Sequence, residues 1–282
     1  RMEIHVVDNA SQDDSVSMVK NEFRDDVRLF QSPENVGFAR ANNASWKVAK
    51  GRYWLLLNSD TQIFPGAIEK LVQFMDAHPK CGLATAKLLN PDGTPQFCAQ
   101  PEPSVKLVWY ETLRIHKFWP PKKRARKLLS TYFGYNEAVR VGWTWGTALI
   151  ARREAVQECG PLDETFHMYG EDTEWCLRMR CAGWQVWFCP DAEIVHYGGQ
   201  SSAKRWDNTE KQLRIDDGFF RAVAMHKGPK YAEKLRRTMN FSVRFEYAVR
   251  RFRSGYWLRR EAWFHAPDPV QHEPPQPEKV GD

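Results

Sequence analysis

Residues 53–61, Tyr-Trp-Leu-Leu-Leu-Asn-Ser-Asp-Thr, decide the fold class of this chain. The first five residues form an uninterrupted apolar run of strand length, which is typical of a strand buried on both faces of an α/β sheet. The run leads into Asp60, and a helical pattern over residues 66–77 follows Pro65. Magnesium and manganese prefer oxygen ligands and are often held by one or two carboxylates plus substrate phosphates. The stretch therefore predicts a central strand that delivers Asp60 as a metal ligand.

Two shorter apolar runs precede this strand. Residues 4–7 predict a strand that ends at Asp8, and residues 27–30 predict a second strand. An acid at the C-terminal end of such a strand lies where open α/β sheets bind ligands. After the second strand, Gly37 allows a tight turn into a helix over residues 38–50, with Arg40 available for phosphate. From these residues alone, a plain loop-to-helix junction explains the second motif equally well.

Residues 168–175, Met-Tyr-Gly-Glu-Asp-Thr-Glu-Trp, place two adjacent carboxylates between a glycine and a helical run. The N-terminal end of a helix favours negative charge because its backbone N–H groups are unpaired and its dipole is positive there. Asp172 is the candidate catalytic base. Taken alone, Glu171 and Asp172 are equally well explained as capping acids.

The composition is that of a globular protein. With 282 residues, of which 42% are hydrophobic and 13% aromatic, the chain can bury one large core with an appendage. No window approaches the roughly 18 apolar residues of a membrane span, and the opening Arg-Met-Glu does not resemble a signal peptide. The six cysteines form no Cys-x-x-Cys pair, which favours reduced thiols and predicts a cytoplasmic location.

The formal net charge of +6 is concentrated in two stretches, residues 114–127 and residues 227–260. Basic patches indicate phosphate-bearing partners. For the second stretch, an anionic membrane surface and a solvated helical face are the competing interpretations, and nucleic acid is disfavoured. We predict that residues 206–265 form a basic amphipathic helical region on the inner face of the plasma membrane, and that residues 266–282 are a disordered tail.

Taken in order, the motifs resemble glycosyltransferase family 2, the inverting sugar-nucleotide transferases with a GT-A fold, and especially its rhamnosyltransferase branch. The resemblance covers roughly residues 3–205. It rests on six short motifs: Val6-Val7-Asp8-Asn9-Ala10-Ser11, residues 35–43, Leu57-Asn58-Ser59-Asp60-Thr61, Trp145-Gly146-Thr147-Ala148, Gly170-Glu171-Asp172 and Val195-His196.

The resemblance implies a single displacement at the anomeric carbon of a nucleoside-diphosphate sugar. Asp172 would remove the proton from the acceptor hydroxyl, and Glu171 would orient this base or contact the donor sugar. Asp60 and His196 would hold Mg²⁺ or Mn²⁺ against the diphosphate. The implied donor-binding residues are Asp8, Asn35, Arg40, Asn58, Asp60, Gly146 and Thr147, and the implied acceptor-binding residues are Trp145 and Trp175.

The chain departs from the family pattern in two places. The family normally has another strand ahead of residues 4–7, so we expect this first strand to be missing and a sheet edge to be exposed. The first position of the Asp-x-Asp metal motif is Asn58, which leaves Asp60 as the charged ligand there.

The predicted fold is therefore GT-A, a Rossmann-like α/β fold with a mixed, mainly parallel sheet flanked by helices and with a C-terminal helical extension. Its domain spans residues 1–205. Residues 1–92 form the nucleotide-binding half, residues 93–142 an irregular acceptor-side insertion, and residues 143–205 the catalytic half.

The predicted function is a metal-dependent inverting glycosyltransferase of cell-surface polysaccharide synthesis. Its donor is dTDP-rhamnose or a UDP-sugar, and its acceptor is a glycan or lipid-linked glycan. One alternative, a GT-A-like nucleotidyltransferase, needs a glycine-rich basic loop that this sequence does not show near its first strand. The other, a non-catalytic sugar- or membrane-binding module, is favoured by Asn58 and the missing strand, whereas Asp60, Asp172 and His196 argue against it.

Overall fold

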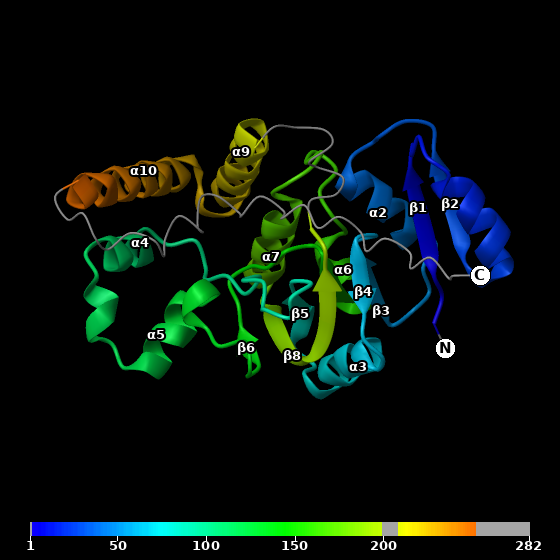
Figure 1. Cartoon of the computed structure of the whole chain (residues 1–282), viewed down its shortest axis with the longest axis horizontal. Helices are drawn as coiled ribbons and strands as arrows, with labels where there is room; N and C mark the ends of the chain where they lie inside the picture. The colour runs from blue at the N-terminus through cyan, green and yellow to red at the C-terminus, as the bar shows by residue number, and fades with distance from the viewer. Residues whose placement is uncertain (1, 199–207, 252–282) are drawn as a thin grey trace, which may run out of the picture.

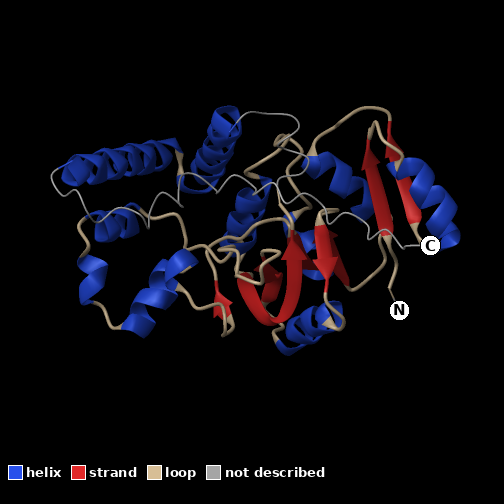
Figure 2. Ribbon diagram, in the orientation of Figure 1, coloured by secondary structure: helices blue, strands red, loops and turns tan. Residues whose placement is uncertain are grey.

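The computed structural model describes residues 2–198 and 208–251. Strands occupy one end and the middle of the molecule, and helices make up the opposite end (Figure 1, Figure 2). The tail predicted at residues 266–282 lies outside the described residues.

A six-stranded sheet forms the centre of the fold. Its strands are β3 (Tyr53–Leu57), β4 (Thr61–Ile63), β5 (Cys81–Leu89), β6 (Val139–Arg140), β7 (Ala148–Arg152) and β8 (Gln185–His196). Their order is β3-β7-β5-β8-β4, and β6 also pairs with β8. Strand β5 is buried almost throughout, as its apolar sequence requires.

A separate two-stranded sheet lies beside it. Strand β1 (His5–Asn9) pairs in parallel with β2 (Arg28–Ser32), with Val6 opposite Leu29. The short helical turns α1 (Ser15–Met18), η1 (Val19–Phe23) and η2 (Arg24–Asp26) connect the two strands, and α2 (Phe38–Trp46) follows β2. Within the described part of the chain, β1 and β3 belong to different sheets.

The mixed α/β architecture with helices around a central sheet is confirmed, but the expectation of mainly parallel strands is wrong. Only β1–β2 and β5–β8 are parallel among the pairings of the described strands, whereas β3–β7, β5–β7, β4–β8 and β6–β8 are antiparallel. The reason is that β7 enters the sheet between β3 and β5 and runs against both.

Three helices cover this sheet. Helix α3 (Ala67–Ala77) buries Ala67, Leu71 and Met75, which share one helical face. Helix α6 (Arg153–Cys159) follows β7, and α7 (Glu171–Cys181) is buried on most of its surface. Because α7 carries the predicted base, this burial decides the electrostatics of the site.

Residues 93–142 are more regular than their prolines suggest. They contain α4 (Val105–Thr112), η3 (Ile115–Phe118), α5 (Pro121–Leu128) and η4 (Ser130–Tyr132). Pro121 begins a helix instead of interrupting one. It occupies the first turn of α5, where a backbone N–H would have no partner within the helix.

Two C-terminal helices complete the described chain, as predicted. Helix α9 (Asn208–Lys227) packs on α7, and α10 (Pro229–Arg251) packs on α4 and α9. Leu177, Val223, Ala232 and Leu235 form a second apolar cluster that joins them. None of the helices in the described residues has the length and apolar character needed to cross a bilayer.

Candidate active site

A cleft of about 2910 Å³ extends from the β1–β2 sheet, past the ends of β3 and α7, to helices α4, α9 and α10. Most of the predicted site residues meet in it although they come from distant parts of the sequence. Those that line it are Asn35, Asn58, Asp60, Trp145, Gly146, Thr147, Glu171, Asp172 and His196.

The carboxylate of Asp172 is held in a fixed orientation at the start of α7. The backbone N–H of Gly146 donates to Oδ2 at 3.0 Å, and the N–H of Thr173 donates to Oδ1 at 2.6 Å. Burial raises the pKa of Asp172, while these hydrogen bonds act in the opposite direction. A base with a raised pKa is a better proton acceptor near neutral pH than an exposed aspartate.

The neighbouring Glu171 is almost fully buried, with 6% of its surface exposed. Its Oε2 atom has no hydrogen-bond partner among the described residues. Burial, followed by the charge of Asp172, raises the pKa of Glu171 to about 8. Two adjacent buried carboxyl groups cannot both ionise easily, so at neutral pH the pair retains a proton.

A second polar group lies in the same cleft, at the end of β8. The β4–β8 register places Thr61 opposite His196, which brings the preceding Asp60 beside the histidine ring. His196 Nε2 lies 3.4 Å from Asp60 Oδ1. The predicted pair of metal ligands therefore meets across one strand pairing.

Gln96 orients this histidine. Its Nε2 atom donates to the backbone oxygen of His196 at 2.8 Å, and its Oε1 atom lies 2.9 Å from His196 Nδ1. With the amide in this orientation, Oε1 is placed to accept from Nδ1–H, and Nε2, the ring nitrogen nearer Asp60, is the one available to a metal. Such outer-shell hydrogen bonds are typical of histidines that bind metals.

These residues fit a divalent cation, because a carboxylate oxygen and an oriented imidazole nitrogen face the cleft together. No cluster of three or more His, Cys, Asp or Glu side chains suited to a metal occurs in residues 2–198 and 208–251. A cation at Asp60 and His196 would therefore take its remaining ligands from substrate phosphates and water, as magnesium sites commonly do.

Backbone hydrogen bonds connect the two polar groups. The N–H of Asn58 donates to the carbonyl oxygen of Thr147 at 2.9 Å, and the preceding residue, Gly146, donates through its N–H to Asp172. The loop after β3 is thus joined to the loop before β7. This connection explains why Asn58, Gly146 and Thr147 lie in one cleft.

Three predicted site residues do not line the cleft and are corrected here. Trp175 is fully buried, donates to the Gly160 carbonyl oxygen at 3.0 Å and packs edge-on against Trp54, so it is a core residue and not an acceptor contact. Arg40 is exposed, pairs with Glu164 at 3.1 Å and is not among the residues that line the cleft. Asp8 is buried at the end of β1, where its Oδ1 accepts from the N–H of Ser11 at 3.2 Å.

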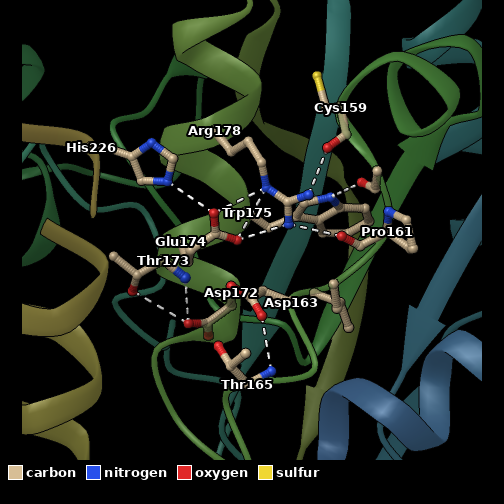
Figure 3. Close-up of polar contacts among 12 residues, drawn as sticks. Cys159, Pro161, Asp163, Thr165, Asp172, Thr173, Glu174, Trp175, Arg178 and His226 are labelled. Atoms are coloured by element: carbon tan, nitrogen blue, oxygen red, sulfur yellow. Dashed lines mark hydrogen bonds and ion pairs between the residues drawn. The ribbon is translucent and has the colours of Figure 1, made fainter. Parts of the chain in front are cut away.

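Sequence reasoning missed a buried polar network that anchors α7 (Figure 3). Glu174 is 1% exposed; its Oε1 lies 2.9 Å from His226 Nε2 on α9, and its Oε2 accepts from Arg178 at 2.8 Å. Arg178 also donates to the carbonyl oxygens of Cys159 and Pro161. The spacing of Glu174 and Arg178 is visible in the sequence, but nothing there indicates His226.

A close backbone contact makes α9 part of the same support. Gly170, which precedes Glu171, has φ +94°, and a Cβ atom there would lie 2.5 Å from the carbonyl carbon of Gly218 on α9. A Cβ on Gly218 would lie 2.3 Å from the Tyr169 oxygen. Only glycines allow this approach, so α9 directly braces the loop that presents the two carboxyl groups.

Comparison with known proteins identifies the family. Residues 1–132 match the family described as Glycosyl transferase family 2. Over these residues, the chain is similar to glycosyltransferase family 2. The predicted family and enzyme class are thereby confirmed. This glycosyltransferase is 27% identical over 212 residues to an N-acetylglucosaminyl-diphospho-decaprenol L-rhamnosyltransferase of Mycobacterium tuberculosis, which corresponds to 71% of the chain and 67% of that protein.

Solved structures show the same fold at low sequence identity. The mannosyltransferase PcManGT from Pyrobaculum calidifontis, in complex with GDP-Man and Mn²⁺, matches with a TM-score of 0.54 and 18% identity, over 90% of this chain and 67% of that one. GalNAc-T7 with UDP, GalNAc and Mn²⁺ matches with a TM-score of 0.53 and 17% identity, over 78% of this chain and 41% of that one. The glycosyltransferase therefore has the predicted GT-A fold.

Proposed function

We propose that this enzyme is an inverting glycosyltransferase that uses a divalent cation and a nucleoside-diphosphate sugar. Its acceptor is a hydroxyl group of a glycan or lipid-linked glycan, in the synthesis of cell-envelope polysaccharide. The observation that carries the proposal is the oriented carboxylate of Asp172, which shares one cleft with the Asp60–His196 pair.

Asp60 and His196 would bind the cation, and the diphosphate would complete its coordination. When bound, the cation supplies positive charge opposite the leaving diphosphate. Asn58 lies beside this position and offers an amide to the sugar or the phosphates. This arrangement makes the β3–β4 turn the donor side of the cleft.

Asp172 would act on the acceptor side. Its carboxylate accepts the proton of the acceptor hydroxyl while that oxygen forms a bond to the anomeric carbon. The bond from the anomeric carbon to the phosphate oxygen breaks, and its electron pair leaves with the nucleoside diphosphate. The N–H groups of Gly146 and Thr173 keep the carboxylate aimed during this displacement.

Glu171 would bind a substrate hydroxyl. Glu171 lines the cleft and its Oε2 atom is buried without a partner among the described residues, so a rotation of this side chain toward a hydroxyl group of the donor or acceptor would supply the missing hydrogen bond. A protonated Glu171 also lets Asp172 remain ionised, because the pair then carries a single negative charge.

The relative from Mycobacterium tuberculosis supports a rhamnosyl donor and a lipid-diphosphate acceptor. We therefore propose dTDP-rhamnose as the first donor to test, followed by UDP-sugars. The test incubates the enzyme with each donor, Mn²⁺ and a soluble glycosyl-diphosphate acceptor, and follows released nucleoside diphosphate and the anomeric configuration of the product by NMR.

Product of inverted configuration from one donor is expected, together with its loss in Asp60→Ala. Asp191→Ala is the matched control, because Asp191 is an exposed carboxylate on the same strand as His196 and does not line the cleft. Retention of configuration, or full activity of Asp60→Ala, would contradict the proposal.

We also propose that the enzyme associates peripherally with an anionic membrane on its cytoplasmic side. Support comes from the end of the molecule formed by α4, η3, α5 and α10 (Figure 1). Phe118 is 90% exposed, although its turn is anchored by buried His116, whose Nδ1 lies 3.1 Å from the Tyr110 oxygen. The basic helix α5 follows directly, and exposed Phe241 and Tyr247 lie on α10. Exposed apolar groups beside cations are typical of interfacial surfaces.

Vesicle flotation tests this association. Wild-type protein should float with vesicles that contain phosphatidylglycerol and not with pure phosphatidylcholine, and Phe118→Ser should weaken the binding. Phe64→Ser is the control, because Phe64 is also exposed but lies near the donor side. Equal flotation with both vesicle types, or an unaffected Phe118→Ser variant, would refute the membrane proposal.

A further inference from the structure

We infer that a groove between α4, α9 and α10 binds the aliphatic chain of a lipid-linked acceptor. This inference rests on the proposed function and names the part of the acceptor that the polar cleft cannot bind. The three-helix groove is lined by Leu107 and Val108 of α4, Ile215 and Phe219 of α9, and Leu235 and Met239 of α10.

Each helix contributes one apolar stripe to the three-helix groove. Ile215 and Phe219 are four residues apart, as are Leu235 and Met239, so each pair lies on one helical face. On α4, Leu107 and Val108 occupy the corresponding face toward the cleft. The stripes converge because the helices pack together, with Val223 and Leu235 buried between them.

The walls are held at both ends by polar contacts. The Tyr231 hydroxyl lies 3.3 Å from both the N–H of Val105 and the carbonyl oxygen of Pro103. At the other end, the Thr112 hydroxyl donates to Ser242 at 2.7 Å. Helices α4 and α10 are therefore fixed relative to one another, and the groove is built into the fold.

The three-helix groove opens into the cleft that contains the candidate base. Trp143 packs against Phe219 with ring centroids 5.7 Å apart, and Trp143 and Trp145 line the path to Gly146 and Asp172. The backbone of residues 100–104 passes very close to Gly142. A Cβ atom added to Gly142 would overlap the backbone of Glu102. Glu102 is also paired with Arg180 of α7 at 2.7 Å, which holds the backbone of residues 100–104 against that helix.

The chemistry of the lining selects the ligand. The aliphatic side chains match an alkyl or isoprenoid chain and offer no hydrogen bond to a nucleotide phosphate, and the acidic Glu111 and Asp216, which line the cleft beside them, would repel a phosphate. Lys211 lies one helical turn before Ile215 and lines the same cleft, without an ion pair to any described residue. An acceptor whose hydroxyl reaches Asp172 would place its sugar near Trp145, its phosphate near Lys211 and its chain in the groove.

The test compares acceptors that differ only in their chain. The same glycosyl diphosphate is prepared with a methyl, a hexyl and a dodecyl group, and kcat and KM are measured for each in detergent-free buffer below micelle formation. Burial of each methylene is worth about a fourfold gain in affinity, so KM should fall steeply from methyl to dodecyl in the wild type while kcat changes little.

Leu107→Asn and Met239→Gln replace groove side chains by polar ones of similar shape. Each should raise KM for the dodecyl acceptor at least tenfold and leave KM for the methyl acceptor unchanged. Leu213→Asn and Met225→Gln carry the same substitutions at positions on α9 that are 65% and 50% exposed and outside the groove. These controls should behave like the wild type.

Failure of this inference differs from failure of the proposed function. Transfer to the methyl acceptor without any gain from a longer chain, or equal chain-length dependence in all four variants, would overturn the groove alone. Absence of transfer to every acceptor would count against the proposed function. In that case a dodecyl phosphate with a terminal diazirine still tests the groove on the wild-type protein: labelling of α4 and α10 peptides supports it, and labelling elsewhere overturns it.

Discussion

The two sides of the catalytic cleft are built in different ways. The donor side depends on local structure, because Asp60 and His196 meet through one antiparallel strand pairing and remain partly exposed. The acceptor side depends on distant structure, because Glu171 and Asp172 are presented by a buried helix that α9 supports through His226 and Gly218. Under the proposed function, the C-terminal helices therefore belong to the acceptor side of the enzyme, and mutations should separate the two sides.

The largest separation is expected from Asp172→Asn. The amide keeps the shape of the side chain but cannot accept the acceptor proton, so kcat should fall about 100- to 10,000-fold. Affinity for the nucleoside diphosphate should stay within about twofold of the wild type, since Asp172 lies on the acceptor side. A kcat within tenfold of the wild type would show that Asp172 is not the base.

A smaller effect, confined to the donor side, is expected from Gln96→Leu. Loss of the hydrogen bond to His196 Nδ1 frees the imidazole ring, and losses of this kind typically weaken metal binding about 10- to 100-fold. Titration of Mn²⁺ in the presence of nucleoside diphosphate, followed by electron paramagnetic resonance, measures the affinity. The control is Gln62→Leu. Gln62 lies on β4, next to the strand of His196, and its side chain contacts Tyr197 and does not line the cleft.

His226→Phe tests the support of the acceptor side. It leaves one oxygen of buried Glu174 without this partner, at a cost of about 1–3 kcal/mol in the free energy of unfolding. The melting temperature should fall by roughly 2–4 °C for each kcal/mol, and kcat should fall while nucleotide affinity is retained. His226→Gln keeps a donor at this position and should restore most of both. If the two variants are equally impaired, the hydrogen bond to Glu174 is not the cause.

The effect expected to change the separation of the two sides least is a pH dependence of stability caused by Glu171. Its pKa is raised from 4.5 to about 8 in the folded protein. Between these values the folded state binds more protons than the unfolded state, so stability falls as pH rises from 4.5 through 8. Glu171→Gln has no titrating group at this position, so its stability should not fall in this way as the pH rises. The difference in melting temperature between Glu171→Gln and the wild type should therefore be several degrees larger at pH 8 than at pH 5. This corresponds to a change on the order of a few kcal/mol in the free energy of unfolding.

Glu174→Gln supplies a comparison for that measurement. Glu174 is equally buried but is paired with Arg178 and His226, so its replacement should destabilise the protein at both pH values. An unchanged pH dependence in Glu171→Gln would show that Glu171 is not protonated in the folded enzyme at neutral pH.

The sequence predicted those elements whose patterns are local. The apolar runs at residues 4–7, 27–30 and 53–57 correspond to β1, β2 and β3, and the helical periodicity at residues 66–77 corresponds to α3. The C-terminal helical pattern likewise corresponds to α9 and α10. Strand direction was not predicted correctly, because the antiparallel entry of β7 between β3 and β5 depends on contacts between residues that are far apart in sequence.

The same distinction applies to the site. Asp60, His196 and Asp172 stand at the ends of recognisable elements, so their positions could be inferred from motifs. Trp175 was assigned to the site because it follows the Glu171–Asp172 motif, and Arg40 because it could bind phosphate from the first turn of its helix, but successive residues of a helix face different surroundings. Gln96 and His226 had no signal of their own, because each acts on a partner about 100 or 50 residues away.

The most direct measurement is a calorimetric titration of the preferred nucleoside diphosphate, with and without Mn²⁺, into the wild type, Asp60→Ala and Asp172→Asn. The separation of the two sides predicts Mn²⁺-dependent binding to the wild type, unchanged binding to Asp172→Asn and loss of binding in Asp60→Ala. Binding that is indifferent to Mn²⁺ and to Asp60, or that is lost in Asp172→Asn, would contradict it.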